Sequence, residues 1–290
     1  MSMEPTAAVS AAAQSDIGLV RPLNQDRVFF SLEPVGVLPD LFVVADAMGG
    51  HKAGDLASSE AVRYFVDYIR QHSSEADDMV LLMKAALEIT NRYIYYLSKE
   101  SPDYEGMGTT FVACTLVGNK LYVINVGDSR LYVVNKAEGI RPMTLSQVTE
   151  DHSVVDMLLK KGLITEDEAR VHPQKNMITR AIGIEEEVQV DHFELDTSNL
   201  LRILMCTDGL SNMLTDLELL SILTEATDKG LSNVQDTVNE LIRRANEKGG
   251  KDNVTALVID LGNQSEDSDK GSQVTQTETE KTGMKGEEDA

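Results

Sequence analysis

Two kinds of hydrophobic periodicity alternate along the chain. Short runs rich in Val, Ile, Leu, Phe and Tyr predict β-strands. These runs are residues 27–32, 41–45, 110–117, 121–126, 131–135, 201–206 and 254–261. Longer segments carry apolar residues at helical spacing and predict helices. These segments are residues 55–72, 78–99 and 230–247.

The turns between the strands indicate how they are connected. Gly118-Asn119 separates two strand runs by two turn-forming residues, which predicts a β-hairpin. The sequence Gly127-Asp128-Ser129-Arg130 predicts a second tight reversal. Strands joined by short reversals, with the long helices grouped apart, favour antiparallel sheets covered by helices. We therefore expect an α+β layered fold rather than a doubly wound parallel sheet.

Three segments differ from this pattern. Residues 147–179 are charged and lack strand periodicity, with short helices expected at 154–161 and 165–170 and Thr165 as an N-cap. An excursion of this kind often covers a site. Residues 1–13 are small and Ala-rich, and we expect a flexible leader. Residues 262–290 have almost no large apolar side chain and predict a disordered acidic tail. The folded domain is then expected at residues 14–261.

The charge balance excludes some partners. The chain has 48 acidic and 26 basic residues, a net charge of −22, and no cluster of Lys and Arg. Nucleic acid and anionic membranes need a basic face, so neither is expected as a partner. Bound cations can still reverse the local field and attract an anionic substrate.

Cellular location follows from the cysteines and the apolar runs. Cys114 and Cys206 lie within apolar runs and form no C-x-x-C pair, which is typical of reduced core cysteines. The N-terminus does not resemble a signal peptide, and no apolar run is long enough for a spanning helix. We expect a cytoplasmic protein.

Candidate chemistry lies at the ends of the strands. Asp46, Asp128, Asp208 and Asp252 each lie at or near a strand terminus beside glycine or another small residue. If these ends coincide, the carboxylates cannot remain ionised together without a cation. Several carboxylate oxygens favour Mg²⁺ or Mn²⁺ over softer metals.

A simpler interpretation competes with this one. A single aspartate after a strand is more often a turn former or a helix N-cap, and Asp208 could cap a helix over residues 210–214. The spacing of the four aspartates alone leaves both interpretations open.

Five sequence blocks resemble the motifs of the metal-dependent PPM (type 2C) protein phosphatases, particularly the bacterial branch. In chain order the blocks are Ser15-Asp16-Ile17-Gly18-Leu19-Val20-Arg21-Pro22-Leu23-Asn24-Gln25-Asp26; Val44-Ala45-Asp46-Ala47-Met48-Gly49-Gly50-His51; Met107-Gly108-Thr109-Thr110; Gly127-Asp128-Ser129-Arg130; and Thr207-Asp208-Gly209-Leu210 with Gly250-Lys251-Asp252-Asn253. Each block alone is a weak signal, and the five in order are specific. They extend over about residues 15–261.

The resemblance implies a fold and a reaction. The fold would be a four-layer α-β-β-α sandwich, with two antiparallel sheets flanked by antiparallel helices and a small flap subdomain at about residues 147–179. The enzyme would be a protein serine/threonine phosphatase with two, or in some bacterial members three, Mn²⁺ or Mg²⁺ ions at one end of the sandwich. A water activated by the ions would attack phosphorus in line. The partners would be phosphorylated proteins, including a Ser/Thr kinase and its substrates, and the protein would be a monomer.

The resemblance also assigns roles to residues of this chain. Asp46 would bridge two metal ions, the backbone carbonyl of Ala47 would bind one of them, and Asp208 and Asp252 would complete the pair. Asp128 with Asp208 would hold the third ion. Arg21 would bind the substrate phosphate. Four further residues would support these ligands from behind: Asp26 through water, with Gln25, His51 and Asn253.

Three positions depart from the family pattern. Ala47 replaces a near-invariant glycine; if that position needs a positive φ, alanine costs about 1–2 kcal/mol. Met48 leaves the proton donor to the leaving group unassigned. Gln25 replaces a frequent glutamate. Ala47 therefore keeps an alternative open, a catalytically weak or silent relative that binds phosphoproteins. For His51 and His152 we expect structural contacts rather than catalysis.

Overall fold

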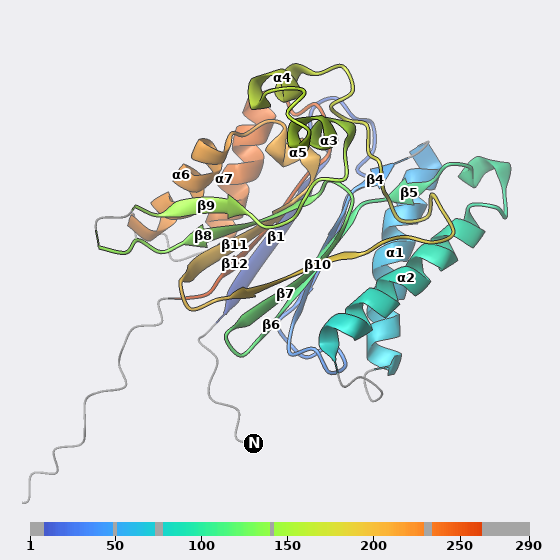
Figure 1. Ribbon diagram of the computed structural model, residues 1–290, viewed down its shortest axis with the longest axis horizontal. Helices are drawn as coiled ribbons and strands as arrows, with labels where there is room; N and C mark the ends of the chain where they lie inside the picture. The colour runs from blue at the N-terminus through green and yellow to red at the C-terminus, as the bar shows by residue number, and fades with distance from the viewer. Residues whose placement is uncertain (1–8, 49–50, 73–77, 140–141, 229–233, 263–290) are drawn as a thin grey trace, which may run out of the picture.

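Two antiparallel sheets lie face to face at the centre of the protein (Figure 1). The computed structural model describes residues 9–48, 51–72, 78–139, 142–228 and 234–262, without the side chains of residues 51, 52, 170 and 226–228. The first sheet has the strand order β1 (Ser10–Asp16), β12 (Val254–Asp260), β11 (Leu200–Cys206), β8 (Arg130–Asn135), β9 (Thr144–Gln147). The second sheet has the order β10 (Asp191–Asp196), β7 (Lys120–Val126), β6 (Phe111–Val117), β3 (Leu41–Ala45), β2 (Arg27–Ser31).

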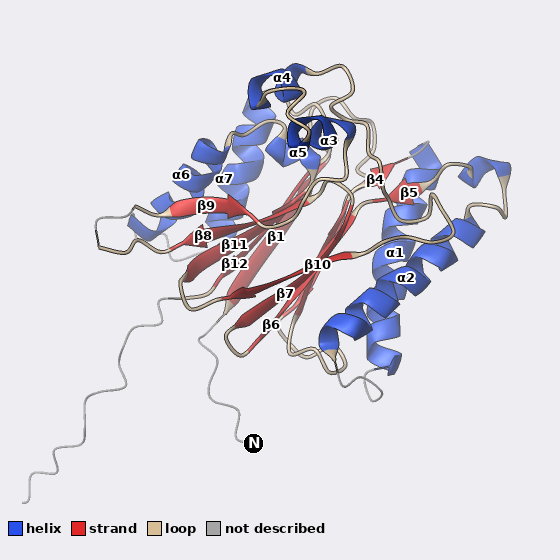
Figure 2. Cartoon of the chain, viewed as in Figure 1, coloured by secondary structure: helices blue, strands red, loops and turns tan. Residues whose placement is uncertain are grey.

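Helices cover the outer face of each sheet (Figure 2). Helices α1 (His51–His72) and α2 (Met79–Leu97) pack on the second sheet, and α6 (Asp216–Asp228) and α7 (Val234–Glu247) pack on the first. The short helices α3 (Val154–Lys160), α4 (Glu166–Val171) and α5 (Asp208–Ser211) gather at one end of the sandwich, where Figure 1 shows them together. Near that end, β4 (Ala47–Met48) pairs with β5 (Gly108–Thr109), and a 3-10 helix spans Pro102–Tyr104.

Three apolar layers hold the sandwich together. In β3, Leu41 and Val43 face helices α1 and α2, whereas Phe42 and Val44 face the opposite sheet. Strand β12 divides its side chains in the same way between α7 and the interior. Because both faces of the central strands are buried, their sequences are continuous apolar runs rather than alternating ones. The same burial explains why these strands can be recognised in the sequence.

The predicted α+β layered fold is confirmed, and the seven predicted strands lie within one residue of the observed bounds. Strands β1, β9 and β10 and helix α6 were not predicted. The edge strand β10 buries its side chains only partly and contains three acidic residues, so no apolar run marks it. The predicted reversal at residues 127–130 instead carries the chain from β7 in the second sheet to β8 in the first.

The predicted leader is wrong for residues 10–13. These residues form the first half of β1, in which Ala12 is buried and pairs with Val258 of β12. Small alanine side chains give little strand signal, and the pairing depends on a partner near the other end of the chain. Residues 1–8 and 263–290, which include the predicted tail, lie outside the described residues.

The two cysteines agree with the expectation of reduced core cysteines. Cys114 and Cys206 are free and buried in the sheets. Within the described ranges, no helix combines the length and the hydropathy required to cross a bilayer.

A buried carboxyl group at the start of β3 makes stability depend on pH. Asp40 accepts hydrogen bonds from the Leu116 N–H at 2.7 Å and the Thr115 hydroxyl at 3.1 Å. Burial raises the pKa of Asp40 from 3.8 to about 6. The folded protein therefore binds this proton more tightly than the unfolded chain does. The resulting stabilisation is fully present below about pH 4 and is lost as the pH rises through about 6.

We expect the substitution Asp40→Asn to remove this pH dependence. Asparagine keeps an oxygen to accept from Leu116 but cannot ionise. Between pH 4 and 7 the unfolding free energy of the variant should therefore gain about 2–3 kcal/mol relative to wild type. Urea unfolding of both proteins across this range measures the difference. A constant difference would contradict the shifted pKa of Asp40.

Candidate functional site

Five aspartates converge at the end of the sandwich beneath α3, α4 and α5. Asp46 follows β3 of the second sheet, and Asp128 lies in the turn from β7 to β8. Asp208 follows β11 and Asp252 precedes β12, both in the first sheet. Burial is the main cause that raises the pKa of Asp46 well above its usual value, and the charges of Asp26, Asp208, Asp128 and Asp252 add to the effect. The five carboxyl groups thus lie within electrostatic reach of one another.

The other carboxyl groups respond to the same environment. Burial is the main cause that raises the pKa of Asp128, and the charge of Asp208 adds to the effect. Burial likewise raises the pKa of Asp208, and the charge of Asp252 adds to it. Burial also raises the pKa of Asp26 to about 7. A group of buried like charges cannot ionise fully without a compensating cation. The site is therefore electrostatically suited to bind positive charge.

Glycine allows two of the carboxylates to approach each other. A Cβ atom on Gly209 would lie 1.9 Å from the carbonyl oxygen of Asn253. No side chain fits in that space, so the segment after β11 rests directly against the segment before β12. This contact holds Asp208 and Asp252 next to each other.

Two threonines hold the backbone of Asp46. The Asp46 N–H donates to the Thr110 hydroxyl at 2.9 Å, and the Thr110 N–H donates to the Asp46 carbonyl at 2.8 Å. The Thr109 hydroxyl donates to the same carbonyl at 2.9 Å. The Thr110 hydroxyl also lies 2.7 Å from that of Ser129, next to Asp128. The sequence block containing Thr109 and Thr110 resembles a family motif, but nothing in the sequence indicated that the two hydroxyls bind the backbone of Asp46.

Asp26 joins the two sheets beneath the cluster. It lies just before β2 of the second sheet. Its Oδ2 accepts from the hydroxyl of Thr255 in β12 of the first sheet at 2.7 Å and from that of Thr207, which follows β11, at 2.9 Å. Its other oxygen, Oδ1, is buried and has no hydrogen-bond partner. A buried oxygen without a partner is costly, and a bound water or cation would satisfy it.

Arg21 lies at the open edge of the cluster. Its Nη2 donates to Asp252 Oδ2 at 2.7 Å, and half of its side chain is exposed, at 50%. The loop that carries Arg21 is fixed by the amide of Asn253, which donates to the carbonyls of Ile17 at 3.0 Å and Leu23 at 2.9 Å. Asn253 Oδ1 also accepts from the Gln25 N–H at 2.8 Å. Asn253 therefore positions the loop.

The positions that depart from the family pattern fit without strain. Ala47 lies in β4 and pairs with Thr109, an extended conformation that suits alanine. The cost considered for a positive φ at Ala47 therefore does not arise. The Gln25 amide lies against Gly54 of α1, close to where Ala47 packs. The side chain of His51 lies outside the described residues.

The donor atoms suit a hard cation, but no ion site is fully formed. The cluster contributes oxygen atoms, which is the chemistry that Mg²⁺ and Mn²⁺ favour. Among the described residues, no three Asp, Glu, His or Cys side chains are arranged so that they could hold one ion. Asp252 is engaged by Arg21, and Asp208 accepts from the Asn212 amide at 3.0 Å. Cation binding would require these two carboxylates to reorient.

A pocket of about 340 Å³ opens beside the cluster. Asp128 and Asp208 form part of its wall, Asn212 of α5's C-terminal end lines one side, and residues of α3 and α4 such as Leu159 and Glu166 line another. The charged excursion predicted at residues 147–179 thus borders the candidate site. The pocket is wide enough to admit part of a polypeptide side chain next to the carboxylates.

Comparisons with known proteins agree with this arrangement. Residues 21–257 match the family model described as protein phosphatase 2C. The serine/threonine phosphatase stp of Listeria welshimeri is 35% identical over 254 residues, covering 86% of this chain and 95% of that protein. The structure of the S. agalactiae serine/threonine phosphatase has a TM-score of 0.77 at 35% identity, covering 88% of this chain and 100% of the other. The catalytic domain of the serine/threonine phosphatase PstP, solved in complex with two manganese ions, has a TM-score of 0.69 at 33% identity, covering 87% of this chain and 97% of the other.

The two antiparallel sheets with helices on both outer faces thus match the fold of solved serine/threonine phosphatases. The chain belongs to the protein phosphatase 2C family, as the sequence blocks indicated, and it is a protein phosphatase.

We expect Gly209→Ala to separate the two strand ends and destabilise the protein. Alanine in α5 would normally favour the helix by up to about 1 kcal/mol over glycine. The contact with a backbone carbonyl outweighs this gain, so we expect a net loss of about 1–3 kcal/mol in unfolding free energy. Urea unfolding of the metal-free protein measures the loss. A Gly209→Ala variant as stable as wild type would mean that the two segments are not in direct contact.

Proposed function

We propose that the protein hydrolyses phosphoserine and phosphothreonine in other proteins at a centre of two divalent cations, Mn²⁺ or Mg²⁺. The observation that carries this proposal is the convergence of Asp46, Asp208 and Asp252 from both sheets at one edge of the sandwich. Isolated turn formers would have no reason to share one electrostatic environment. The relatives named serine/threonine phosphatases and the manganese complex of PstP support the substrate class and the metal.

Each residue has a defined part in this proposal. Asp46, Asp208, Asp252 and the backbone carbonyl of Ala47 would hold the two cations. When bound, the cations would lower the pKa of a water and neutralise charge on the phosphoryl oxygens. Arg21, half-exposed at the edge of the cluster, would exchange its bond to Asp252 for the substrate phosphate. Asp26, Gln25 and Asn253 would hold the ligands and the loop in place.

A third cation would bind between Asp128 and Asp208, as the resemblance to the bacterial family members implies. Burial and the Asp208 charge disfavour the ionised form of Asp128, and a cation would reverse this effect. We propose that the substrates come from a Ser/Thr kinase acting in the same cell. The alternative of a silent relative loses its main support, because Ala47 adopts an extended conformation.

An assay on phosphopeptides tests the proposal. We expect the purified protein with Mn²⁺ to release phosphate from phosphoserine and phosphothreonine peptides, and much less after chelation. Asp208→Ala removes a proposed ligand of the cations. The substitution should raise the activation free energy by roughly 3 kcal/mol or more, which lowers the rate about a hundredfold or more. A wild-type protein that binds Mn²⁺ but releases no phosphate would favour a phosphoprotein-binding role. Equal rates for wild type and Asp208→Ala would point to a contaminating phosphatase.

Metal binding should also be visible without catalysis. Adding Mn²⁺ at about 100 times its dissociation constant should stabilise the wild-type protein by about 2.7 kcal/mol, observed as a higher melting temperature. Asp46→Asn removes one of the repelling charges, so we expect the metal-free variant to melt no lower than wild type. The variant should show little increase with Mn²⁺. A full increase in Asp46→Asn would exclude Asp46 as a ligand.

A further inference from the structure

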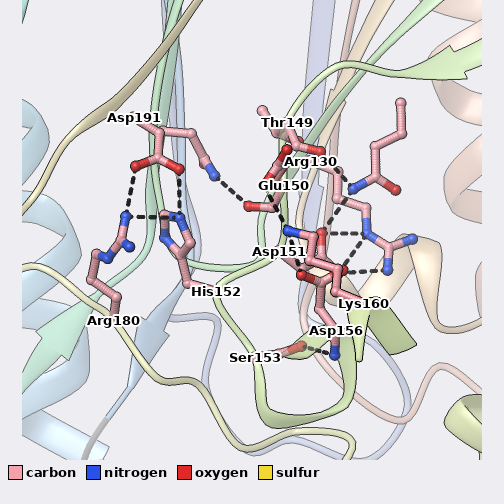
Figure 3. A network of polar contacts seen from close by, with 12 residues as sticks. Arg130, Thr149, Glu150, Asp151, His152, Ser153, Asp156, Lys160, Arg180 and Asp191 are labelled. Carbon is pink, nitrogen blue, oxygen red and sulfur yellow. Dashed lines mark hydrogen bonds and ion pairs between the residues drawn. The ribbon is translucent and has the colours of Figure 1, made fainter. Parts of the chain in front are cut away.

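The base of the flap, residues 148–154, contacts the chain on both sides of Asp128. Figure 3 shows Asp151 of this segment beside Arg130. The Leu131 N–H donates to the Thr149 hydroxyl at 3.0 Å, and the Asn125 amide donates to the Glu150 carbonyl at 3.1 Å. Arg130 binds Asp151 through two nitrogens, with Nη2 2.6 Å from Oδ2 and Nε 3.0 Å from Oδ1. Residues on both sides of Asp128 are therefore held by one segment of the flap base.

His152 contacts Gly127, the residue before Asp128. Its ring nitrogen Nδ1 accepts from the Gly127 N–H at 2.9 Å, and its backbone N–H donates to the Gly127 carbonyl at 3.0 Å. Its own carbonyl accepts from the Thr179 N–H at 2.8 Å, at the far end of the flap. The side chain is buried, at 7% exposure. His152 thus joins the Asp128 turn to both ends of the flap.

The hydrogen bonds determine the tautomer of the ring. Because Nδ1 accepts from Gly127, the proton of the neutral ring is on Nε2, which lies 3.0 Å from Asp191 Oδ2 and donates to it. Arg180 Nη1, 2.9 Å from Nε2, then donates to Asp191 Oδ1 at 2.7 Å rather than to the ring. Burial is the main cause that lowers the pKa of His152, which keeps the ring neutral. Figure 3 shows Asp191 facing both the His152 ring and Arg180.

We propose that His152 is a positioning residue that fixes the turn of residues 127–130 so that Asp128 stays directed towards Asp208, and that it thereby links cation binding at Asp128 to the attachment of the flap. The inference rests on the proposed metal centre. Asp191, at the start of β10, orients the ring, and Arg180 holds Asp191. In metal sites generally, residues that hydrogen-bond to a ligand from outside the site set the orientation of that ligand. His152 would act on Asp128 in this way through the backbone of Gly127.

Two substitutions separate the two ends of the ring. In His152→Asn, the side-chain oxygen can occupy the place of Nδ1 and still accept from Gly127. In His152→Gln, the side chain reaches the place of Nε2 and can still bond Asp191, but offers no acceptor to Gly127. Calorimetric titration with Mn²⁺ measures cation affinity, and Asp128→Ala identifies the part of the signal that depends on Asp128.

We expect His152→Gln to weaken the Asp128-dependent Mn²⁺ binding by about 10- to 100-fold, and His152→Asn to retain it within about threefold. The Mn²⁺ concentration for half-maximal hydrolysis should rise in His152→Gln and change little in His152→Asn. The KM for an aryl phosphate should change less than this concentration does. Equal affinities in the two variants, whether unchanged or equally weakened, would overturn the role of the Gly127 contact. Circular dichroism and melting of the metal-free variants verify folding.

If His152→Gln does not fold, Asp191→Ala provides the test. Loss of the whole carboxyl group removes the acceptor that orients the ring, so we expect weaker Asp128-dependent binding, roughly 10-fold. Unchanged affinity in this variant would overturn the proposal. A wild-type protein that neither binds Mn²⁺ nor hydrolyses phosphopeptides would instead overturn the proposed function itself. Because that result needs no variant, it is distinguishable from failure of the inference about His152.

Discussion

Mutual repulsion among five buried or half-buried carboxyl groups is the constraint on which the rest of the site depends. Asp26, Asp46, Asp128, Asp208 and Asp252 lie within reach of one another's charge, and burial disfavours ionisation of the first four. Burying like charges is strongly unfavourable unless a cation compensates them. The protein therefore tolerates a locally unfavourable arrangement, which the proposed divalent cations would relieve.

The groups that hold these carboxylates in place are mostly neutral. The hydroxyls of Thr207 and Thr255 donate to Asp26. The Asn212 amide donates to Asp208 and the Asn253 backbone N–H to Asp252, while Arg21 lies at the exposed edge. Neutral donors orient a carboxylate without cancelling its charge, so the field remains available to a cation. Gly209 serves the same purpose by geometry, since it lets two strand ends touch.

The sequence predicts most of the fold and the main residues of the site, for identifiable reasons. Strands such as β3 and β12 are buried on both faces and stand out as apolar runs, and aspartates at their ends indicate one acidic edge. Strands β1 and β10 lie at sheet edges, where alanine or acidic residues suffice, and were not predicted. The roles of Thr110 and His152 depend on partners that only the folded chain brings together. A buried threonine beside a strand, or a histidine after an aspartate, is compatible with many surroundings.

The origin of the carboxylates in different sheets has a mechanical consequence. Asp46 belongs to the second sheet and Asp208 to the first, so their separation is set by the thickness and alignment of the layer between the sheets, which includes Phe42, Leu131 and Leu257. Tightly packed interiors transmit displacement rather than absorb it. The spacing between Asp46 and Asp208, the proposed metal ligands, is thus inherited from hydrophobic residues that lie in the layer between the sheets. Sequence drift in that inner layer would then tune the proposed metal centre from a distance.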